Sequence, residues 1–373
     1  KYLISEEGKE LGLPVKPLDL KNILVIAGSI GIIFFMLNFK QIFKNDLDII
    51  SYFIYGAMLI MPIIILSDKS LTSIERKRII VVFILAFFVI FFWGAFEQAG
   101  ASLTLFADRQ VDRDMSLFVP GWLIILAGIS IMYFLSKGLK WFFDWRKNMD
   151  YIVTGVVALL LIILFALGYI PNIDKTEFPA SWFQSVNPLA VICLAPVFSM
   201  IWGYLYKKRL EPSSSKKMEI GLALVALGYV VIAIAVKGLG VSGKTSMIWL
   251  FSLYIIHSMG ELCLSPIGLS MVSKLAPLRL SSLMMGTWFL ANAAANKFAG
   301  TLSALIPPTV EAGSTEPVVY PSFMGIQITN LYEFFMLFII MTAVAAGILL
   351  LISGWLEKMI TEKHTDAHVE ELR

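Results

Sequence analysis

The sequence predicts an all-α polytopic membrane protein with about ten transmembrane helices. Hydrophobic residues make up 58% of its 373 residues and charged residues only 15%, whereas soluble chains are roughly 45–50% apolar and ~25% charged. Apolar runs longer than about 18 residues recur along the chain, and this is the length that a helix needs to cross a bilayer. Lysine and arginine also concentrate in alternate loops. Together these observations exclude an ordinary soluble domain.

The chain begins with a polar segment, 1–20, in which Gly12 and Pro14 interrupt regular structure, so we expect a cytoplasmic linker there. Ten apolar runs follow, and each is expected to form a transmembrane helix. They cover residues 21–39, 47–66, 78–101, 117–136, 151–171, 186–206, 217–236, 246–273, 281–304 and 331–356. Pro196 and Pro266 lie inside runs without ending them, because membrane helices tolerate proline where neighbouring groups satisfy the backbone.

The basic residues of the loops predict the orientation of these helices. Most of the 30 lysines and arginines lie near the two ends of the chain and in every second loop, on one side of the predicted membrane. The positive-inside rule makes that side cytoplasmic. An even number of spans then leaves both termini in the cytoplasm, as in a multi-pass protein of the inner (cytoplasmic) membrane. The long loop 306–329, on the other side, contains no lysine or arginine, which agrees with this orientation.

The segment 207–217, KKRLEPSSSKK, is strongly basic. A plain cytoplasmic loop that obeys the charge rule explains it. Binding of anionic lipid is the alternative interpretation.

Signs of soluble catalysis are weak. The sequence contains no GxSxG nucleophile elbow and no HExxH pair, and no nucleotide-binding domain is evident beside the apolar runs. We therefore expect no enzyme activity, no cofactor, no metal site and no nucleic-acid partner.

The stretch Tyr254–Pro277 carries the strongest functional signal. Glu261 lies about 15 residues into an apolar run, so at a rise of ~1.5 Å per residue it falls near the middle of the bilayer. An ionised carboxylate at that depth costs roughly 2.5 kcal/mol or more. Two interpretations are open, namely a hydrogen-bonded group that holds helices together and a proton or substrate site.

His257, Glu261 and Ser265 follow one another at i, i+4 spacing, so we expect them on one helix face. His257 could modulate the carboxylate, and a hydrogen-bonded structural histidine is the alternative. Two possible ligands on one helix leave a metal site incomplete.

Further polar and aromatic residues lie where lipid should be. Glu97 lies in the outer half of its span with Trp93 one turn earlier, either as a snorkelling carboxylate or facing a water-filled cavity where its protonation changes. Asn187 offers donors and acceptors to a polar ligand, or to a neighbouring helix. Trp288 either walls a pocket or marks the membrane interface.

At these residues the chain resembles the proton-coupled oligopeptide transporter (POT/PTR) family of the major facilitator superfamily. Four stretches carry the resemblance: FFWGAFEQAGASLTLFADRQVDR (91–113), PASWFQSVNPLAVICLAPVFSMIW (179–202), GELCLSPIGLSMVSKLAP (260–277) and MGTWFLANAAANKFAG (285–300). The resemblance implies that 67–113 and 179–373 form the C-terminal six-helix bundle of that fold. It also implies that 21–66 is the extra helix pair that bacterial members carry between their two halves.

Two departures from the family pattern shape the expected domains. Residues 114–178 replace a short loop and are expected to form an inserted, peripheral helix pair whose inner loop is basic. The N-terminal six-helix half, with its ExxERFxYY signature, is absent from this sequence. We therefore expect that the 373 residues alone do not transport.

The resemblance also implies roles for single residues. Glu97 corresponds to the carboxylate assigned to proton binding and Trp93 to the aromatic residue one turn before it. Asn187 corresponds to the asparagine that contacts peptide backbone, and Glu261 to the carboxylate that receives the peptide amino terminus. The peptide pocket would also include Ser265 and Trp288.

The expected function is proton-driven symport of di-/tripeptides by alternating access, with this chain supplying the C-terminal half of the peptide site. Its partners would be peptide, protons, the lipid bilayer and the N-terminal half. The alternatives are a transporter of nitrate or another small solute on the same fold, or a non-transporting membrane assembly or receptor subunit.

Overall fold

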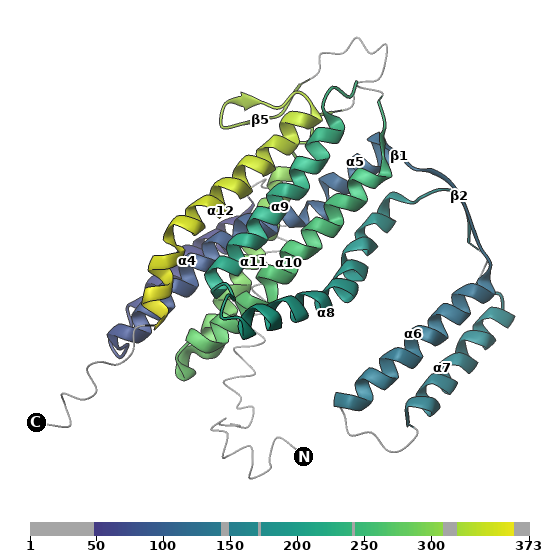
Figure 1. Ribbon diagram of the computed structural model, residues 1–373. Helices are drawn as coiled ribbons and strands as arrows, with labels where there is room; N and C mark the ends of the chain where they lie inside the picture. Colours follow the sequence, from purple (N-terminus) through teal and green to yellow (C-terminus); the bar gives the residue numbers. More distant parts are fainter. Residues whose placement is uncertain (1–47, 143–148, 171–172, 241–242, 309–318, 362–373) are drawn as a thin grey trace, which may run out of the picture.

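The computed structural model describes residues 48–142, 149–170, 173–240, 243–308 and 319–361, and these residues are mainly helical (Figure 1). The predicted linker 1–20 and the predicted span 21–39 lie outside the described residues. Every predicted span from 47–66 onward coincides with a helix. Seven helices in the described part of the chain are long and apolar enough to cross a membrane. The predicted fold class, an α-helical polytopic membrane protein, is confirmed.

The elements follow in a simple order. The helices are α3 (Ile49–Leu66), α4 (Ser73–Phe96), η2 (Glu97–Gly100), α5 (Ser102–Gln110), α6 (Gly121–Phe142), α7 (Met149–Ala166), η3 (Ala180–Ser185), α8 (Val186–Lys207), α9 (Ser214–Val236), α10 (Met247–Leu275), η4 (Leu278–Leu280), α11 (Ser281–Ser303) and α12 (Leu331–Thr361). Short strands pair as β1 (Val111–Asp112) with β4 (Thr245–Ser246), β2 (Asp114–Val119) with β3 (Ile173–Glu177), and β5 (Ser322–Phe323) with β6 (Ile326–Gln327).

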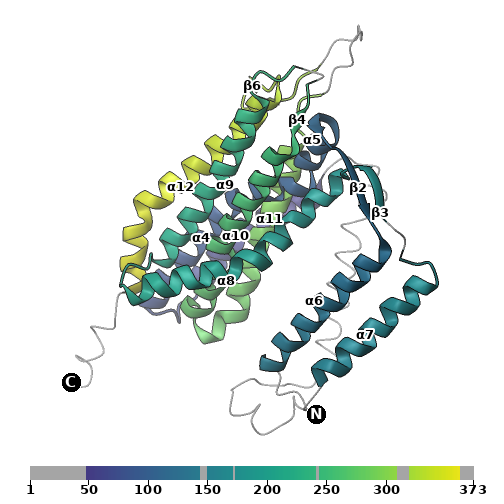
Figure 2. The same ribbon diagram turned by 45° about the vertical axis from the view of Figure 1, so that its right-hand side comes forward.

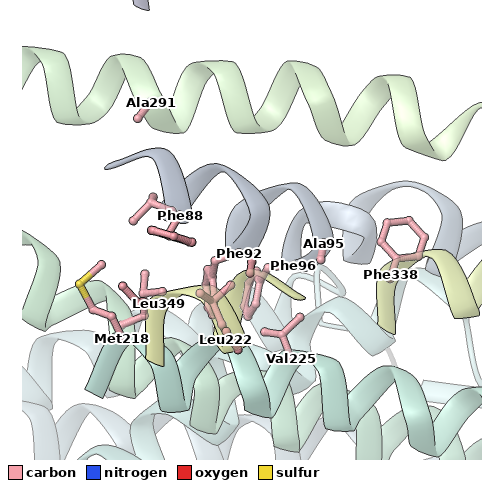
Figure 3. Packing of buried hydrophobic residues seen from close by; sticks show 14 of the residues in the cluster. Phe88, Phe92, Ala95, Phe96, Met218, Leu222, Val225, Ala291, Phe338 and Leu349 are labelled. Carbon is pink, nitrogen blue, oxygen red and sulfur yellow. The ribbon is translucent and has the colours of Figure 1, made fainter. Parts of the chain in front are cut away.

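The core of the bundle lies where α9 packs against α10 and α12, and where α4 packs against α11 and α12. Figure 3 shows Phe88, Phe92 and Phe96 of α4 directed toward Leu222 and Val225 of α9. Lipid is as apolar as these side chains, so close packing rather than the hydrophobic effect holds membrane helices together.

Two glycines let α9 and α10 approach closely. A Cβ atom added at Gly221 would lie 2.9 Å from the carbonyl oxygen of Gly260, and one added at Gly260 would lie 2.9 Å from that of Gly221. Small residues at a helix interface allow this approach of two backbones.

The helix α4 ends at Phe96 and continues as the tighter turn η2 before α5 begins. Its freed carbonyl groups find donors on other helices, as the absence of water in a bilayer requires. The Tyr229 hydroxyl donates to the Ala95 carbonyl (2.7 Å) and the Tyr254 hydroxyl to the Ala99 carbonyl (3.3 Å). One bond runs in the opposite direction, because the buried Gln98 amide of η2 donates to the Ala299 carbonyl of α11 (3.0 Å).

Residues 114–178 contain a separate hairpin of helices. The strands β2 and β3 pair antiparallel, and α6 packs against α7. Figures 1 and 2 both show this pair standing beside the bundle at the end of the two strands. The hairpin leaves and rejoins the bundle at one place, because Phe178 N–H donates to the Arg113 carbonyl (2.8 Å) and the Arg113 guanidinium donates to the Phe178 carbonyl (3.0 Å).

The helix α3 lies at the edge of the bundle, against α11. Asp48, which caps its first turn, forms an ion pair with Lys297 of α11. Beyond its other end, the Arg279 guanidinium donates to the Ser70 hydroxyl (2.6 Å) and the Ser70 carbonyl (2.9 Å). Polar contacts at both ends therefore hold α3 in place.

Candidate functional site

The structure brings together two of the predicted site residues from different helices. Asn187 lies in the first turn of α8, and Glu261 lies near the middle of the 29-residue helix α10. The Asn187 amide donates to Glu261 Oε2 (2.9 Å) and to the Ser258 hydroxyl (3.0 Å). Both Asn187 and Glu261 are only partly buried, so the pair remains open to a ligand.

Sequence reasoning missed Ser258, the third member of this group. Its hydroxyl donates to the Tyr254 carbonyl of its own helix (2.8 Å) and accepts from Asn187. The residue is fully buried. Its position one turn before Glu261 was the available signal, since residues three apart in a helix are neighbours. Ser258 therefore helps to hold the amide that orients the carboxylate.

Glu97 begins η2, at the break after α4, and its side chain is half-buried. It lies close enough to Glu261 for the two charges to interact. Among the residues that the structure describes, no hydrogen bond or ion pair reaches its carboxylate. The fold thus leaves a second carboxylate without a partner among the described residues, within range of the charge of Glu261.

The aromatic residues predicted for the site are packing partners in this structure. Trp93 is half-buried and meets Phe96 edge to face, with ring centroids 5.2 Å apart. Trp288 is only 4% exposed, and its ring covers Gly268 of α10 so closely that an added Cβ there would lie 2.4 Å away. Ser265 lies one turn after Glu261, half-buried. Their contacts with a ligand stay predictions.

His257 is directed elsewhere than the neighbouring carboxylate. Its ring is buried against Tyr229 and Phe96, with centroids 5.0 and 6.0 Å away, and its Nε2 atom lies 3.2 Å from the Val225 carbonyl oxygen. Residues four apart in a helix are offset by about 40° around the axis. That offset turns His257 toward α9, while Glu261 faces α8. Its role as a modulator stays a prediction, and its contacts here are those of a structural histidine.

One segment bears on the expectation that the chain carries no nucleotide-binding domain. Residues 238–245, GLGVSGKT, match the letters of a phosphate-binding P-loop, which the sequence reasoning overlooked. A P-loop follows a strand and opens a helix around the phosphate. Here the 23-residue helix α9 precedes the segment, and residues 241–242 lie outside the described ones. The context that would confirm the motif is therefore not present in the described part.

The arrangement suits a small cation that carries hydrogen-bond donors. Glu261 offers a carboxylate held at one oxygen, Asn187 offers its amide oxygen while both of its N–H groups are bonded to Glu261 and Ser258, and Glu97 offers a position for a proton. Within the described residues, no group of three His, Cys, Asp or Glu is placed to hold a metal ion.

Comparison with known proteins indicates the family of this chain. Residues 161–318 match the family model described as the POT family. The chain is 31% identical over 257 residues to the peptide transporter YePEPT of Yersinia enterocolitica, covering 68% of this chain and 39% of that protein. It is 26% identical over 328 residues to a di-/tripeptide transporter of Lactococcus lactis subsp. cremoris, covering 83% and 52%. This chain thus spans about half or less of the length of these curated relatives.

Solved structures show the same fold. A crystal structure of a peptide transporter POT in complex with sulfate matches with a TM-score of 0.61 and 24% identity, covering 93% of this chain and 56% of that one. A POT family transporter in complex with 5-aminolevulinic acid matches with a TM-score of 0.59 and 25% identity, covering 95% and 56%. Both matches again cover only part of the neighbour's chain.

Proposed function

The chain belongs to the POT family, and from this premise we propose that it supplies the C-terminal half of a proton-driven di-/tripeptide symporter. An N-terminal six-helix half would complete the peptide site, and alternating access would follow from rocking of the two halves. We place the protein in the inner (cytoplasmic) membrane with both termini in the cytoplasm, because the basic loops lie on one side of the predicted spans.

The Asn187–Glu261 contact is the observation that carries this proposal. Glu261 Oε2 accepts from Asn187, while Oε1 accepts no hydrogen bond from any residue that the structure describes. A peptide ammonium group could bind there, since a charge-assisted hydrogen bond to a carboxylate is among the stronger polar contacts. The Asn187 amide would then contact the peptide backbone. Recognition of the amino terminus and backbone leaves the peptide side chains unspecified.

The Glu97 carboxylate supports the coupling of this site to protons. Ionised Glu97 and Glu261 would repel each other at their separation in this structure. A proton on Glu97 removes that repulsion, so Glu261 can stay charged and receive an ammonium group. Once the ammonium neutralises Glu261, Glu97 no longer faces a net charge and its proton can leave. Glu97 is thus proposed as the proton site and Glu261 as the peptide site.

Uptake of a labelled dipeptide into liposomes that hold the full-length transporter tests both roles. Glu261→Gln should weaken dipeptide binding by about 30-fold or more, because loss of one partner from a buried charge pair costs ~2–5 kcal/mol. Glu97→Gln should abolish uptake driven by a proton gradient and retain exchange of internal for external peptide. Glu177→Gln, on an exposed side chain of β3, serves as the matched control and should do neither. Full proton-driven uptake by the Glu97→Gln variant would contradict the assignment of Glu97 as the proton site.

The same liposomes separate the alternative functions. Unlabelled dipeptides should compete with the labelled one, and nitrate should not. The names of the curated relatives favour peptide over nitrate. Competition by nitrate would point to a small-solute transporter, and absence of any uptake would favour a non-transporting membrane subunit.

A further inference from the structure

A cavity of about 260 Å³ lies at the end of the bundle that the charge distribution predicts to be cytoplasmic. Three helices converge there, namely the start of α9 and the last turns of α10 and α12. The lining residues are Ser213, Ser214, Ser215, Met271, Lys274, Leu275, Glu357, Ile360 and Thr361. Pockets that enclose drug-sized ligands measure roughly 300–1,000 Å³, so this one suits a smaller group.

Two hydroxyl groups in this cavity are buried without a partner. The Ser215 side chain is only 1% exposed, and neither its Oγ nor that of Ser213 is hydrogen-bonded to any residue that the structure describes. Ser213 precedes the first turn of α9 but its side chain does not cap the helix. Buried polar side-chain atoms in native proteins are nearly always hydrogen-bonded, and leaving one unsatisfied costs energy. A ligand that accepts hydrogen bonds would satisfy both hydroxyls.

The charges around the cavity indicate that this ligand is an anion. The first turn of a helix leaves backbone N–H groups without intrahelical partners, and its dipole favours negative charge. Lys274 adds a cation that forms no ion pair with any described residue. Glu357 is the acidic group of the lining. It would repel a bare anion, but it can accept hydrogen bonds from hydroxyl groups attached to a phosphate.

We propose that this cavity binds a phosphate group, which the Ser213 and Ser215 hydroxyls, the N-terminus of α9 and Lys274 contact together. Anionic phospholipids and free phosphate share this chemistry. The serines belong to the basic segment 207–217, for which the sequence left a plain loop and lipid binding as alternatives. A plain loop would not require hydroxyl groups buried in a cavity, so the buried serines favour lipid binding. Anionic lipids also gather in the cytoplasmic leaflet.

The test is a titration of the purified chain in neutral detergent with phosphatidylglycerol, phosphatidylcholine or inorganic phosphate, read by native mass spectrometry and by thermal unfolding. Phosphatidylglycerol should bind and stabilise. Ser213→Ala/Ser215→Ala should weaken that binding about tenfold or more, because two hydrogen bonds to a charged group are lost. Lys274→Gln should weaken it about fivefold, as for one lysine near an anionic headgroup.

The control variants are Ser252→Ala, whose hydroxyl is bonded within its own helix (2.7 Å), and Lys244→Gln, an exposed lysine before the opposite end of α10. Both should bind like the unaltered chain. Without ligand, Ser213→Ala/Ser215→Ala should melt no earlier than the unaltered chain, because the hydroxyls it removes have no protein partner.

Binding of inorganic phosphate with no preference between the two lipids would support the site and assign it to a soluble anion. Equal binding by Ser213→Ala/Ser215→Ala and the unaltered chain would overturn the proposal. So would earlier melting of that variant without ligand, or the absence of binding by both phosphatidylglycerol and phosphate.

Discussion

The helices α8 and α9 follow each other in the chain and are similar in length and apolar character, yet the structure uses them differently. α9 has 23 residues and buries 12 of them, whereas α8 has 22 residues and buries only Phe198. α9 packs on both α10 and α12, while α8 lies against α10 (Figure 2). Hydrophobicity alone therefore does not separate a helix that builds the bundle from one that presents a site. The site residue Asn187 lies on the less buried helix.

The largest difference in stability between α8 and α9 is expected from a glycine-to-alanine substitution made in each helix. Gly221→Ala in α9 places a Cβ atom 2.9 Å from the Gly260 carbonyl oxygen, so backbone must shift. We expect the free energy of unfolding to fall by about 1–3 kcal/mol, as in overpacked cores. Gly203→Ala in α8 meets nothing within 4 Å and should be neutral or gain up to ~1 kcal/mol from helix propensity. Chemical unfolding in detergent measures both, and an equal loss would contradict the comparison.

A smaller effect is expected from the polar contact of α8. Asn187→Ala removes both hydrogen bonds to α10, and we expect a loss of about 1 kcal/mol, since hydrogen bonds between membrane helices average ~0.6 kcal/mol each. Leu189→Ala, on a residue 62% exposed, is the control and should change little. The same unfolding measurement applies. If Leu189→Ala costs more than Asn187→Ala, α8 is held by its apolar face instead.

At the edge of the bundle, the helix α3 is held by an ion pair whose contribution to stability depends on pH. The Lys297 ammonium, helped by Ser51, lowers the pKa of Asp48 from its usual 3.8 to about 2. A depressed carboxyl pKa stabilises the folded state above pH ~4, and this contribution is lost as pH falls from 3.8 toward 2. The side chains are 48% and 36% exposed, so we expect at most ~1 kcal/mol. Asp48→Asn should therefore be less stable than the unaltered chain at pH 6, and the gap should narrow as pH falls below 3.8 and close only below about pH 2.

The smallest effect is expected from excising the α6–α7 hairpin. Replacing residues 114–177 by a short Gly-Ser linker joins Arg113 to Phe178, whose backbones are already hydrogen-bonded. We expect the unfolding of the bundle to change by no more than about 0.5 kcal/mol, as for surface changes. The matched comparison is the intact chain in the same detergent. A larger loss would show that the hairpin packs against the bundle and contributes to it.

Much of the fold could be predicted from apolar runs, because each run of sufficient length crosses the membrane as one helix. The helix α4 begins at Ser73, earlier than the run at 78, since Thr72 and Glu75 cap each other ahead of the apolar residues. The strand β1 pairs with β4 across more than 130 positions of sequence. Local patterns do not report such pairings, so this one could not be predicted from the sequence.

The candidate site was only partly accessible from sequence. Glu261 and Glu97 are visible as charges inside apolar runs, but the contact of Asn187 with Glu261 depends on how α8 packs on α10. Only the family resemblance placed Asn187 and Glu261 together. The i, i+4 spacing predicted His257 on the same helix face as Glu261. Residues four apart are offset by about 40° around the helix axis, and His257 lies against α9 instead.

The break at η2 has a mechanical consequence. A helix interruption inside a membrane usually offers a hinge, but this one is fastened to three neighbours, by Tyr229 to α9, by Tyr254 to α10 and by Gln98 to α11. Bending at that point would pull hydrogen bonds away from carbonyl groups that have no water to replace them. We therefore expect α4, α9, α10 and α11 to move together as one stiff unit, with Glu97 at a point that does not bend.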